Sequence, residues 1–189
     1  MASSTPPPEL LAELAAALDH AGVPYMVVGS FASALHGRPR ATQDVDVVID
    51  PPAGSLPALL AAFPDDRFYV SPEAAADALR RRTMFNAIDH RSGWKIDLMV
   101  RKDRPFSRAE FDRRIAAPWR GGTLHVASAE DVVVAKLEWA QSSGSARQIE
   151  DVAAVLKLQG DALDRDYIRK WVAALGLETP WRSALESDS

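Results

Sequence analysis

The chain lacks cysteine altogether, among 189 residues. Without cysteine it can form neither a disulfide framework nor a thiolate metal site. A reducing compartment is the simplest fit to that composition, so we expect a cytoplasmic protein. Met1 to Glu9 contains no basic stretch before an apolar core, and we expect no signal peptide there. No apolar run is long enough to span a bilayer, so we expect no membrane association.

The sequence also lacks an excess of positive charge. It carries 22 Lys and Arg against 26 Asp and Glu, a formal net charge of −4. This balance argues against sequence-independent coating of DNA, although a local basic patch could still contact RNA. The P-loop, G-x-S-x-G and H-E-x-x-H motifs are absent, which removes three common routes to catalysis.

Strand-like and helix-like patterns alternate up to about residue 127, and only helical patterns follow. We therefore expect a mixed core over residues 1–127 and a helical part over residues 128–189. The length suffices for one good hydrophobic core with a small appended unit. Strands are expected at 25–28, 44–49, 68–70, 84–89, 94–100 and 123–126, and helices at 9–20, 31–35, 56–63, 73–79, 108–114, 128–141, 147–158, 164–175 and 180–185.

The most informative motif pairs a Gly-Ser turn with two carboxylates. Gly29 and Ser30 follow an apolar run and precede a short helical segment, for which Ser30 is the expected N-cap. Asp44 and Asp46 lie in a predicted buried strand, where residues two apart share a face. Two carboxylates on one face require a cation, a proton or a basic group, while a helix N-terminus can hold phosphate. The combination is typical of a nucleotide site.

Asp97 is the third candidate carboxylate. It shares one face of a predicted strand with Lys95 and Met99, and for an isolated aspartate this would indicate a solvated strand face. Because Asp44 and Asp46 already demand a cation, a third carboxylate on a neighbouring strand is a better candidate for a metal ligand or a base. Mg²⁺ prefers oxygen ligands and takes the others from water and substrate phosphates.

The loop between the Gly-Ser turn and the carboxylates is basic. It contains His36, Arg38 and Arg40, in a Gly-Arg-Pro-Arg stretch that is normally a solvated turn. Beside a site for a polyphosphate, an arginine would instead make charge-assisted phosphate contacts. Arg40 is the candidate for this role.

Lys136 and Asp151 each lie on the apolar side of a predicted helix. A lysine in an apolar arc must extend to solvent, pair with an acid or serve a ligand. One interpretation is a buried ion pair that clamps the two helices together. The other places Lys136 on nucleotide phosphates, with Asp151 orienting it or the acceptor. Both can hold at once.

Gly29-Ser30, Asp44-Val45-Asp46 and Asp97 together resemble the signature of the polymerase β-like nucleotidyltransferase superfamily. The likeness extends from about Leu10 to Leu185 and is greatest to a bacterial subgroup related to abortive-infection toxins of type IV toxin–antitoxin pairs. Further matching segments in the second half are Glu130-Asp131, Lys136 to Ala140, Ser145 to Gln148, Asp151-Val152, Leu163-Asp164, Tyr167 and Trp171.

The resemblance implies an α/β (α+β) nucleotidyltransferase fold, a mixed β-sheet flanked by helices, with a helical C-terminal part that closes the cleft. It implies catalysis with Mg²⁺, in a two-metal site that could also take Mn²⁺. Matching residues have the following implied roles: Asp44, Asp46 and Asp97 form the metal triad, Gly29 and Ser30 the phosphate turn, and Lys136 and Asp151 the later motifs.

The implied reaction transfers a nucleoside monophosphate from an NTP to a hydroxyl of RNA, tRNA or protein. Asp44 and Asp46 would hold the metals, and Asp97 would ligate the catalytic metal and assist deprotonation of the acceptor. Such a protein would act as a toxin with an antitoxin partner. The alternative is a non-catalytic nucleotide- or RNA-binding member of the fold that acts with a protein partner.

Overall fold

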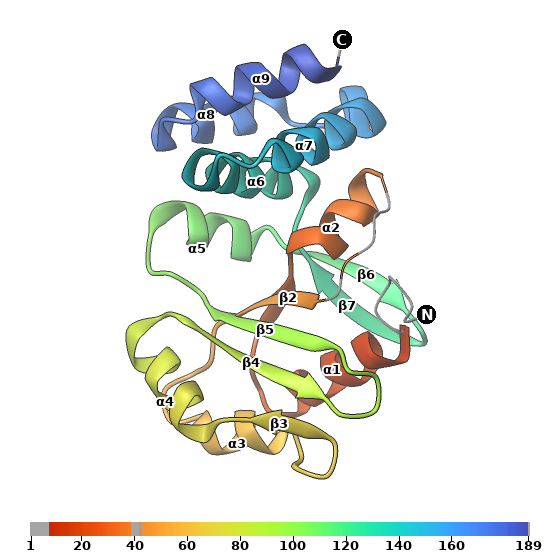
Figure 1. Ribbon diagram of the computed structural model, residues 1–189, viewed down its shortest axis with the longest axis vertical. Coiled ribbons are helices and arrows are strands. Elements are labelled where there is room, and N and C mark those ends of the chain that lie inside the picture. The colour runs from red at the N-terminus through yellow and green to blue at the C-terminus, as the bar shows by residue number, and fades with distance from the viewer. Residues whose placement is uncertain (1–7, 39–41, 43, 189) are drawn as a thin grey trace. The chain divides into compact units, whose positions relative to one another are not determined.

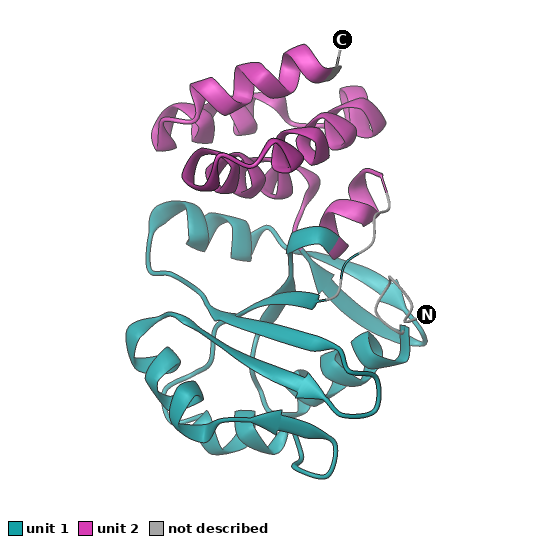
Figure 2. Cartoon of the chain, in the orientation of Figure 1, with its two compact units in different colours: residues 1–30, 40–126 teal, residues 31–39, 127–189 magenta. Residues whose placement is uncertain are grey.

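The computed structural model describes residues 8–38, 42 and 44–188, so the predicted contact of Arg40 lies outside the described residues. The chain divides into two compact units (Figure 2). Residues 1–30 and 40–126 form unit 1, and residues 31–39 and 127–189 form unit 2. The sequence prediction drew its boundary at residue 127 but assigned residues 31–39 to the core.

Unit 1 is built on a mixed sheet, in which the described residues form seven strands in the order β3-β4-β5-β2-β1-β7-β6. The two central strands, β2 and β5, run parallel, as do β1 and β7, while the other neighbours are antiparallel. Figure 1 shows the arrangement. The strands are β1 Tyr25–Val27, β2 Asp44–Ile49, β3 Phe68–Val70, β4 Met84–Asp89, β5 Lys95–Val100, β6 Ile115–Trp119 and β7 Gly122–Val126.

Alternation along β2, β4 and β5 gives the sheet one apolar face and one polar face. On β2, Val45, Val47 and Ile49 are fully buried, whereas the intervening residues are partly exposed. The apolar face is covered by helices: α4 packs against β4 and β5, and α1 packs against β7. The helices of this unit are α1 Pro8–His20, α3 Leu56–Ala61, α4 Pro72–Arg81 and α5 Pro105–Asp112.

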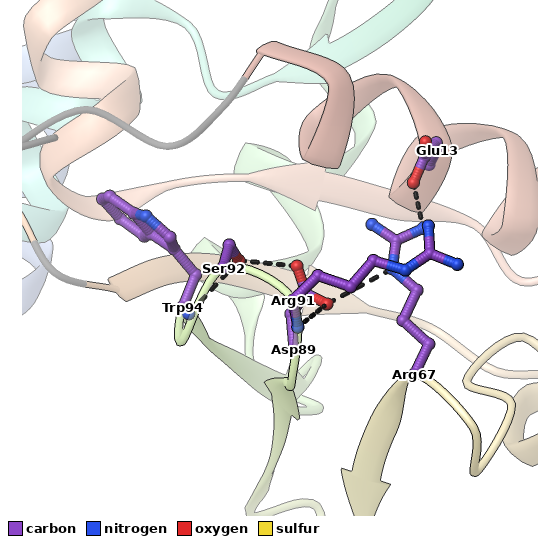
Figure 3. Close-up of polar contacts among 6 residues, drawn as sticks. All are labelled: Glu13, Arg67, Asp89, Arg91, Ser92 and Trp94. Atoms are coloured by element: carbon purple, nitrogen blue, oxygen red, sulfur yellow. Dashed lines mark hydrogen bonds and ion pairs between the residues drawn. The ribbon is translucent and has the colours of Figure 1, made fainter. Parts of the chain in front are cut away.

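The turn between β4 and β5 is held by a buried carboxylate, Asp89 (Figure 3). Its oxygens accept hydrogen bonds from Ser92 Oγ at 2.5 Å, Arg91 N at 3.2 Å and Arg67 Nε at 3.3 Å. Arg67 also pairs with Glu13 of α1. Burial alone would raise the pKa of Asp89, but these three donors lower it below its ordinary value. Through these ion pairs and hydrogen bonds, the cluster joins the residue before β3, the hairpin turn and α1.

Unit 2 is helical. Ser128 caps α6, where its Oγ accepts from Asp131 N at 3.2 Å, and Gly144 ends α6 with a φ of 68°. The end of α2 joins this unit, because Gln159 Nε2 donates to His36 O and His36 Nε2 lies 2.8 Å from Ala127 O. The helices are α2 Gly29–His36, whose first two residues belong to unit 1, α6 Ala129–Ser143, α7 Ala146–Gln159, α8 Arg165–Leu175 and α9 Glu178–Asp188, with a short 3₁₀ turn at Gly160–Ala162.

Three local predictions were wrong. Helix α2 begins at Gly29, so Ser30 lies in its first turn and is not the N-cap, and His36 ends that helix instead of lying in the basic loop. Strand β6 was not predicted, because its sequence contains Pro118 and its residues do not alternate between buried and exposed.

Within the described parts of the chain, none of the helices combines the length and the apolar character that a bilayer span requires.

Candidate active site

Parallel pairing of β2 and β5 brings the three predicted carboxylates together on one face of the sheet. Asp46 lies in register with Asp97, and Asp44 lies in register with Lys95. All four side chains are on the face opposite the buried Val45 and its neighbours, because residues two apart on a strand share a face. The face that the sequence predicted to carry a cation site therefore contains three acids and one lysine.

Gly29 brings the start of α2 against this face. Val28 N donates to Asp46 O at 2.9 Å, which ties the turn before the helix to β2. Gly29 has a φ of +62°, and a Cβ at this position would lie 2.7 Å from Asp46 Cγ. A side chain is excluded both by the left-handed backbone and by the carboxylate. The N-terminal end of α2, where backbone N–H groups favour anions, thus lies beside Asp46.

Lys95 provides the positive charge on this face. Its Nζ lies 2.8 Å from Asp97 Oδ2 and 3.8 Å from Asp44 Oδ2. The hydrogen bond to Asp97 raises the pKa of Lys95, partial burial opposes that effect, and the charges of Asp97, Asp44 and Asp46 add to it. The lysine is therefore an ammonium that balances part of the charge of three acids.

Asp97 is only half satisfied by this arrangement. Its side chain is 8% exposed, and while Oδ2 meets Lys95, Oδ1 is buried with no hydrogen-bond partner among the residues that the structure describes. A buried acceptor without a donor is costly unless something else binds it. A divalent cation is a fitting occupant, because hard cations take carboxylate oxygens.

Two carboxylates of this face contact the lysine, and the described residues of the face do not form a ready metal-binding cluster. Within residues 8–38, 42 and 44–188, no group of three His, Cys, Asp or Glu side chains is arranged to hold a metal ion. The donor set suits Mg²⁺ in kind, but in the described conformation the Lys95 ammonium contacts Asp97 and Asp44. A metal that used Asp97 and Asp44 would have to displace that ammonium.

Thr42 is a further contributor to the site that sequence reasoning missed. Its Oγ1 donates to Asp44 Oδ1 at 2.8 Å and lies 3.0 Å from Asp44 O. These contacts orient the first carboxylate of the triad. A hydroxyl two residues before an aspartate is a weak signal, because such local turns are common wherever a strand begins.

The polar face continues from the acids onto β4 and β3. Asn86 lies in register with Asp97, and Ile88 lies in register with Lys95. Tyr69, in register with Ile88, is 58% exposed and Met84 is 51% exposed. Large apolar side chains in contact with water beside a row of polar groups are typical of a ligand-binding surface.

In unit 2, Lys136 and Asp151 form the ion pair that one interpretation of the sequence predicted. Lys136 Nζ lies 2.7 Å from Asp151 Oδ2 and 3.0 Å from Gln148 Oε1, and it is buried between α6 and α7. The pair therefore clamps these two helices. Its role in nucleotide binding stays a prediction.

Several of the other polar residues that carry the sequence resemblance in unit 2 make contacts between helices. Asp131 is fully buried and accepts from Tyr167 Oη at 2.6 Å and from Ser128 Oγ at 2.7 Å. Glu130 Oε1 accepts from Asp164 N at 3.1 Å. These contacts join the start of α6 to the start of α8.

No protein-family model and no curated protein matches the sequence. Solved structures do match the fold. The structure of ANT(2")-Ia in complex with adenylyl-2"-tobramycin has a TM-score of 0.58 and 15% identity, and the likeness covers 92% of this chain and 98% of that one.

Two other solved structures agree. A nucleotidyltransferase-like antigenic protein from Paracoccidioides brasiliensis has a TM-score of 0.59 and 21% identity, covering 95% of this chain and 92% of that one. The lincosamide antibiotic adenylyltransferase LnuA, bound to lincomycin, has a TM-score of 0.52 and 13% identity, covering 78% and 94%. The chain therefore has the fold of nucleotidyltransferases, and the predicted fold class, a mixed sheet flanked by helices, is confirmed.

Proposed function

We propose that this protein is a divalent-metal-dependent nucleotidyltransferase that moves a nucleoside monophosphate from an NTP to a hydroxyl. The observation that carries the proposal is the register of Asp46 with Asp97, beside a helix start whose Gly29 admits no side chain. The unsatisfied Oδ1 of Asp97 supports a metal at the same place. Structural likeness to two adenylyltransferases of antibiotics supports the reaction class.

The roles of the residues follow from their positions. Asp44, Asp46 and Asp97 would hold Mg²⁺ or Mn²⁺, in a two-metal site that lowers the charge on the phosphates when it is filled. Asp97 would ligate the catalytic metal with one carboxylate oxygen and accept the proton of the acceptor hydroxyl with the other. The hydroxyl oxygen then bonds to the α-phosphorus while the bond from that phosphorus to the bridging oxygen breaks, and pyrophosphate leaves.

The phosphates would be held by the start of α2. Backbone N–H groups at Gly29 and the hydroxyl of Ser30, in the first turn, are suited to the β- and γ-phosphates. The sequence also predicts phosphate contacts for Arg40, from the basic loop, and for Lys136, with Asp151 orienting Lys136 or the acceptor. For Lys136 this role would come in addition to the helix clamp, since its ion pair leaves the ammonium charged.

The acceptor would lie over the polar face of β4 and β3. Asn86 offers hydrogen bonds next to Asp97, and Tyr69, Met84 and Ile88 offer apolar contact. This mixture suits an acceptor with an apolar side and a single reacting hydroxyl. The resemblance to abortive-infection toxins instead implies an RNA, tRNA or protein acceptor and an antitoxin partner, and this remains the competing class of acceptor.

One experiment tests the activity and sorts the acceptors. The purified protein is incubated with Mg²⁺ and each of the four NTPs, together with lincomycin, tobramycin, total tRNA or a bacterial protein extract. Mass spectrometry then looks for an acceptor heavier by one nucleoside monophosphate, and pyrophosphate is measured in parallel. Product from wild type and none from Asp46→Asn is the expected result.

The alternative is a non-catalytic nucleotide- or RNA-binding protein that acts with a partner protein. It predicts that NTP and metal bind and stabilise the fold, yet no pyrophosphate forms with any acceptor. A ligand present at a hundredfold its dissociation constant stabilises a protein by about 2.7 kcal/mol, so this binding would be visible in a melting curve.

A further inference from the structure

Lys95 lies where a cation bound by the acidic face would lie. It is in register with Asp44 on the neighbouring parallel strand, and its Nζ contacts the carboxylates of both Asp97 and Asp44. The charges of these two acids and of Asp46 all act on the same ammonium. The chain therefore supplies its own counter-ion to the acids that the proposed function assigns to a metal.

The lysine is held in a way that allows it to leave. Its side chain is 42% exposed, and its flexible four-carbon stem carries a single point charge. Arg67, the cation beside Asp89, offers a contrast, because its side chain is only 15% exposed. An ion pair with one end in solvent contributes little and exchanges readily.

We propose that Lys95 is a tethered counter-ion that occupies the acidic face in the absence of metal and transfers to the phosphates of the nucleotide when a divalent cation binds. This inference rests on the proposed function. In the site without nucleotide, Lys95 would compete with the divalent cation for the acids. Once a triphosphate is present, Lys95 would contact the phosphates instead, and binding of the cation would be favoured. Metal and nucleotide would bind cooperatively for this reason, since the phosphates give the displaced ammonium a new partner.

The proposal predicts two opposite effects of Lys95→Met. Mn²⁺ alone should bind about five- to tenfold more tightly, because no ammonium has to be displaced. The gain in Mn²⁺ affinity produced by a nonhydrolysable ATP analogue should shrink by a similar factor, because the phosphates lose a cationic partner. Lys95→Arg should keep the weak binding of Mn²⁺ alone, since it retains the charge.

Free Mn²⁺ can be measured by electron paramagnetic resonance with and without α,β-methylene-ATP. Lys102→Met is the matched control, because Lys102 is an exposed lysine of unit 1 on the loop that follows β5. It should leave both affinities unchanged. Melting curves check folding: Lys95→Met should melt lower than wild type without metal and recover with Mn²⁺, as expected for acids that have lost their counter-ion.

Two results would overturn the inference. If Lys95→Met binds Mn²⁺ alone as weakly as wild type, or more weakly, the lysine does not compete with metal. If the cooperativity between Mn²⁺ and the ATP analogue is unchanged, the ammonium does not reach the phosphates. The proposed function fails separately, and the inference with it, if wild type binds no Mn²⁺ even with the analogue and Asp46→Asn behaves identically.

Discussion

Two buried aspartates of one hairpin, Asp89 and Asp97, show how differently the same side chain is used. Asp89 ends β4 on the apolar face, Asp97 lies in β5 on the polar face, and both residues are buried. Asp89 accepts hydrogen bonds from three residues, whereas Asp97 has one cation on Oδ2 and a buried Oδ1 without a partner in the described chain.

The difference lies in what each carboxylate still has to bind. A fully hydrogen-bonded carboxylate stabilises the fold and has no capacity left for a ligand. A buried carboxylate with an oxygen that accepts no hydrogen bond, as in Asp97 within the described chain, still has capacity for a ligand. Burial alone therefore does not separate a structural acid from a functional one, but the completeness of its contacts does.

The largest expected effects come from exchanging each carboxylate for its amide. Asp97→Asn should reduce nucleotide transfer by about a thousandfold, because the proposed function makes Asp97 a metal ligand and the proton acceptor. Its free energy of unfolding should stay within about 1 kcal/mol of wild type, since the lost ion pair has its lysine end in solvent while repulsion among the acids falls. Initial rates of pyrophosphate release and urea unfolding measure the two quantities.

Asp89→Asn is the matched variant on the same hairpin and should show the reverse. The free energy of unfolding should fall by about 3 kcal/mol, because the Arg67 guanidinium loses a buried partner. Transfer activity measured well below the melting temperature should change less than about threefold. The expected pattern is a large loss of activity in a stable Asp97→Asn protein and a small loss of activity in Asp89→Asn. Equal losses of activity in the two variants would contradict the comparison.

Lys136 and Asp151 extend the comparison to unit 2. Lys136→Met and Asp151→Asn should each cost about 3 kcal/mol of stability, because each leaves a buried charge without its partner. The double variant should recover at least half of the summed loss in a thermal-unfolding cycle. If Lys136 also contacts phosphates, Lys136→Met should weaken NTP binding more than Asp151→Asn does. If the two substitutions are strongly coupled in stability and Lys136→Met binds NTP as tightly as wild type, Lys136 serves only to clamp the two helices.

The smallest effect concerns acid stability. The pKa of Asp89 is lowered in the folded protein, so its contribution is complete above the unfolded value and is lost as pH falls through the lower folded value. Urea unfolding of wild type should therefore weaken more between about pH 5 and pH 2 than that of Asp89→Asn. If the free energy of unfolding falls with pH by the same amount in both proteins, Asp89 is not held by the contacts described.

Much of the fold could be predicted because its patterns are local. The strands expected at 44–49 and 84–89 match β2 and β4, and the expected Ser128 cap matches the start of α6, which ends two residues beyond the expected 141. Strand β6 could not be predicted, because its strand conformation depends on pairing with β7 and is not encoded by alternation. The assignment of residues 31–39 to unit 2 likewise depends on contacts distant in sequence, such as that between His36 and Gln159.

The acidic residues of the site could be predicted from the sequence, but the lysine that balances part of their charge could not. Spacing alone placed Asp44 and Asp46 on one face, and placed Asp97 and Lys95 together on another strand. That β2 and β5 pair in parallel, with Asp44 opposite Lys95, is a tertiary fact. The sequence therefore indicated three acids that need a cation, but it did not reveal that the chain provides one.

The central claim is that the acids of β2 and β5 form a metal-dependent nucleotide site. Titration of wild type and Asp46→Asn with an ATP analogue, with Mg²⁺ and with EDTA, in a calorimeter tests it most directly. The account predicts binding by wild type only in the presence of Mg²⁺, and at least about a hundredfold weaker binding by a normally folded Asp46→Asn. Equal affinity with Mg²⁺ and EDTA, or in both proteins, would contradict it.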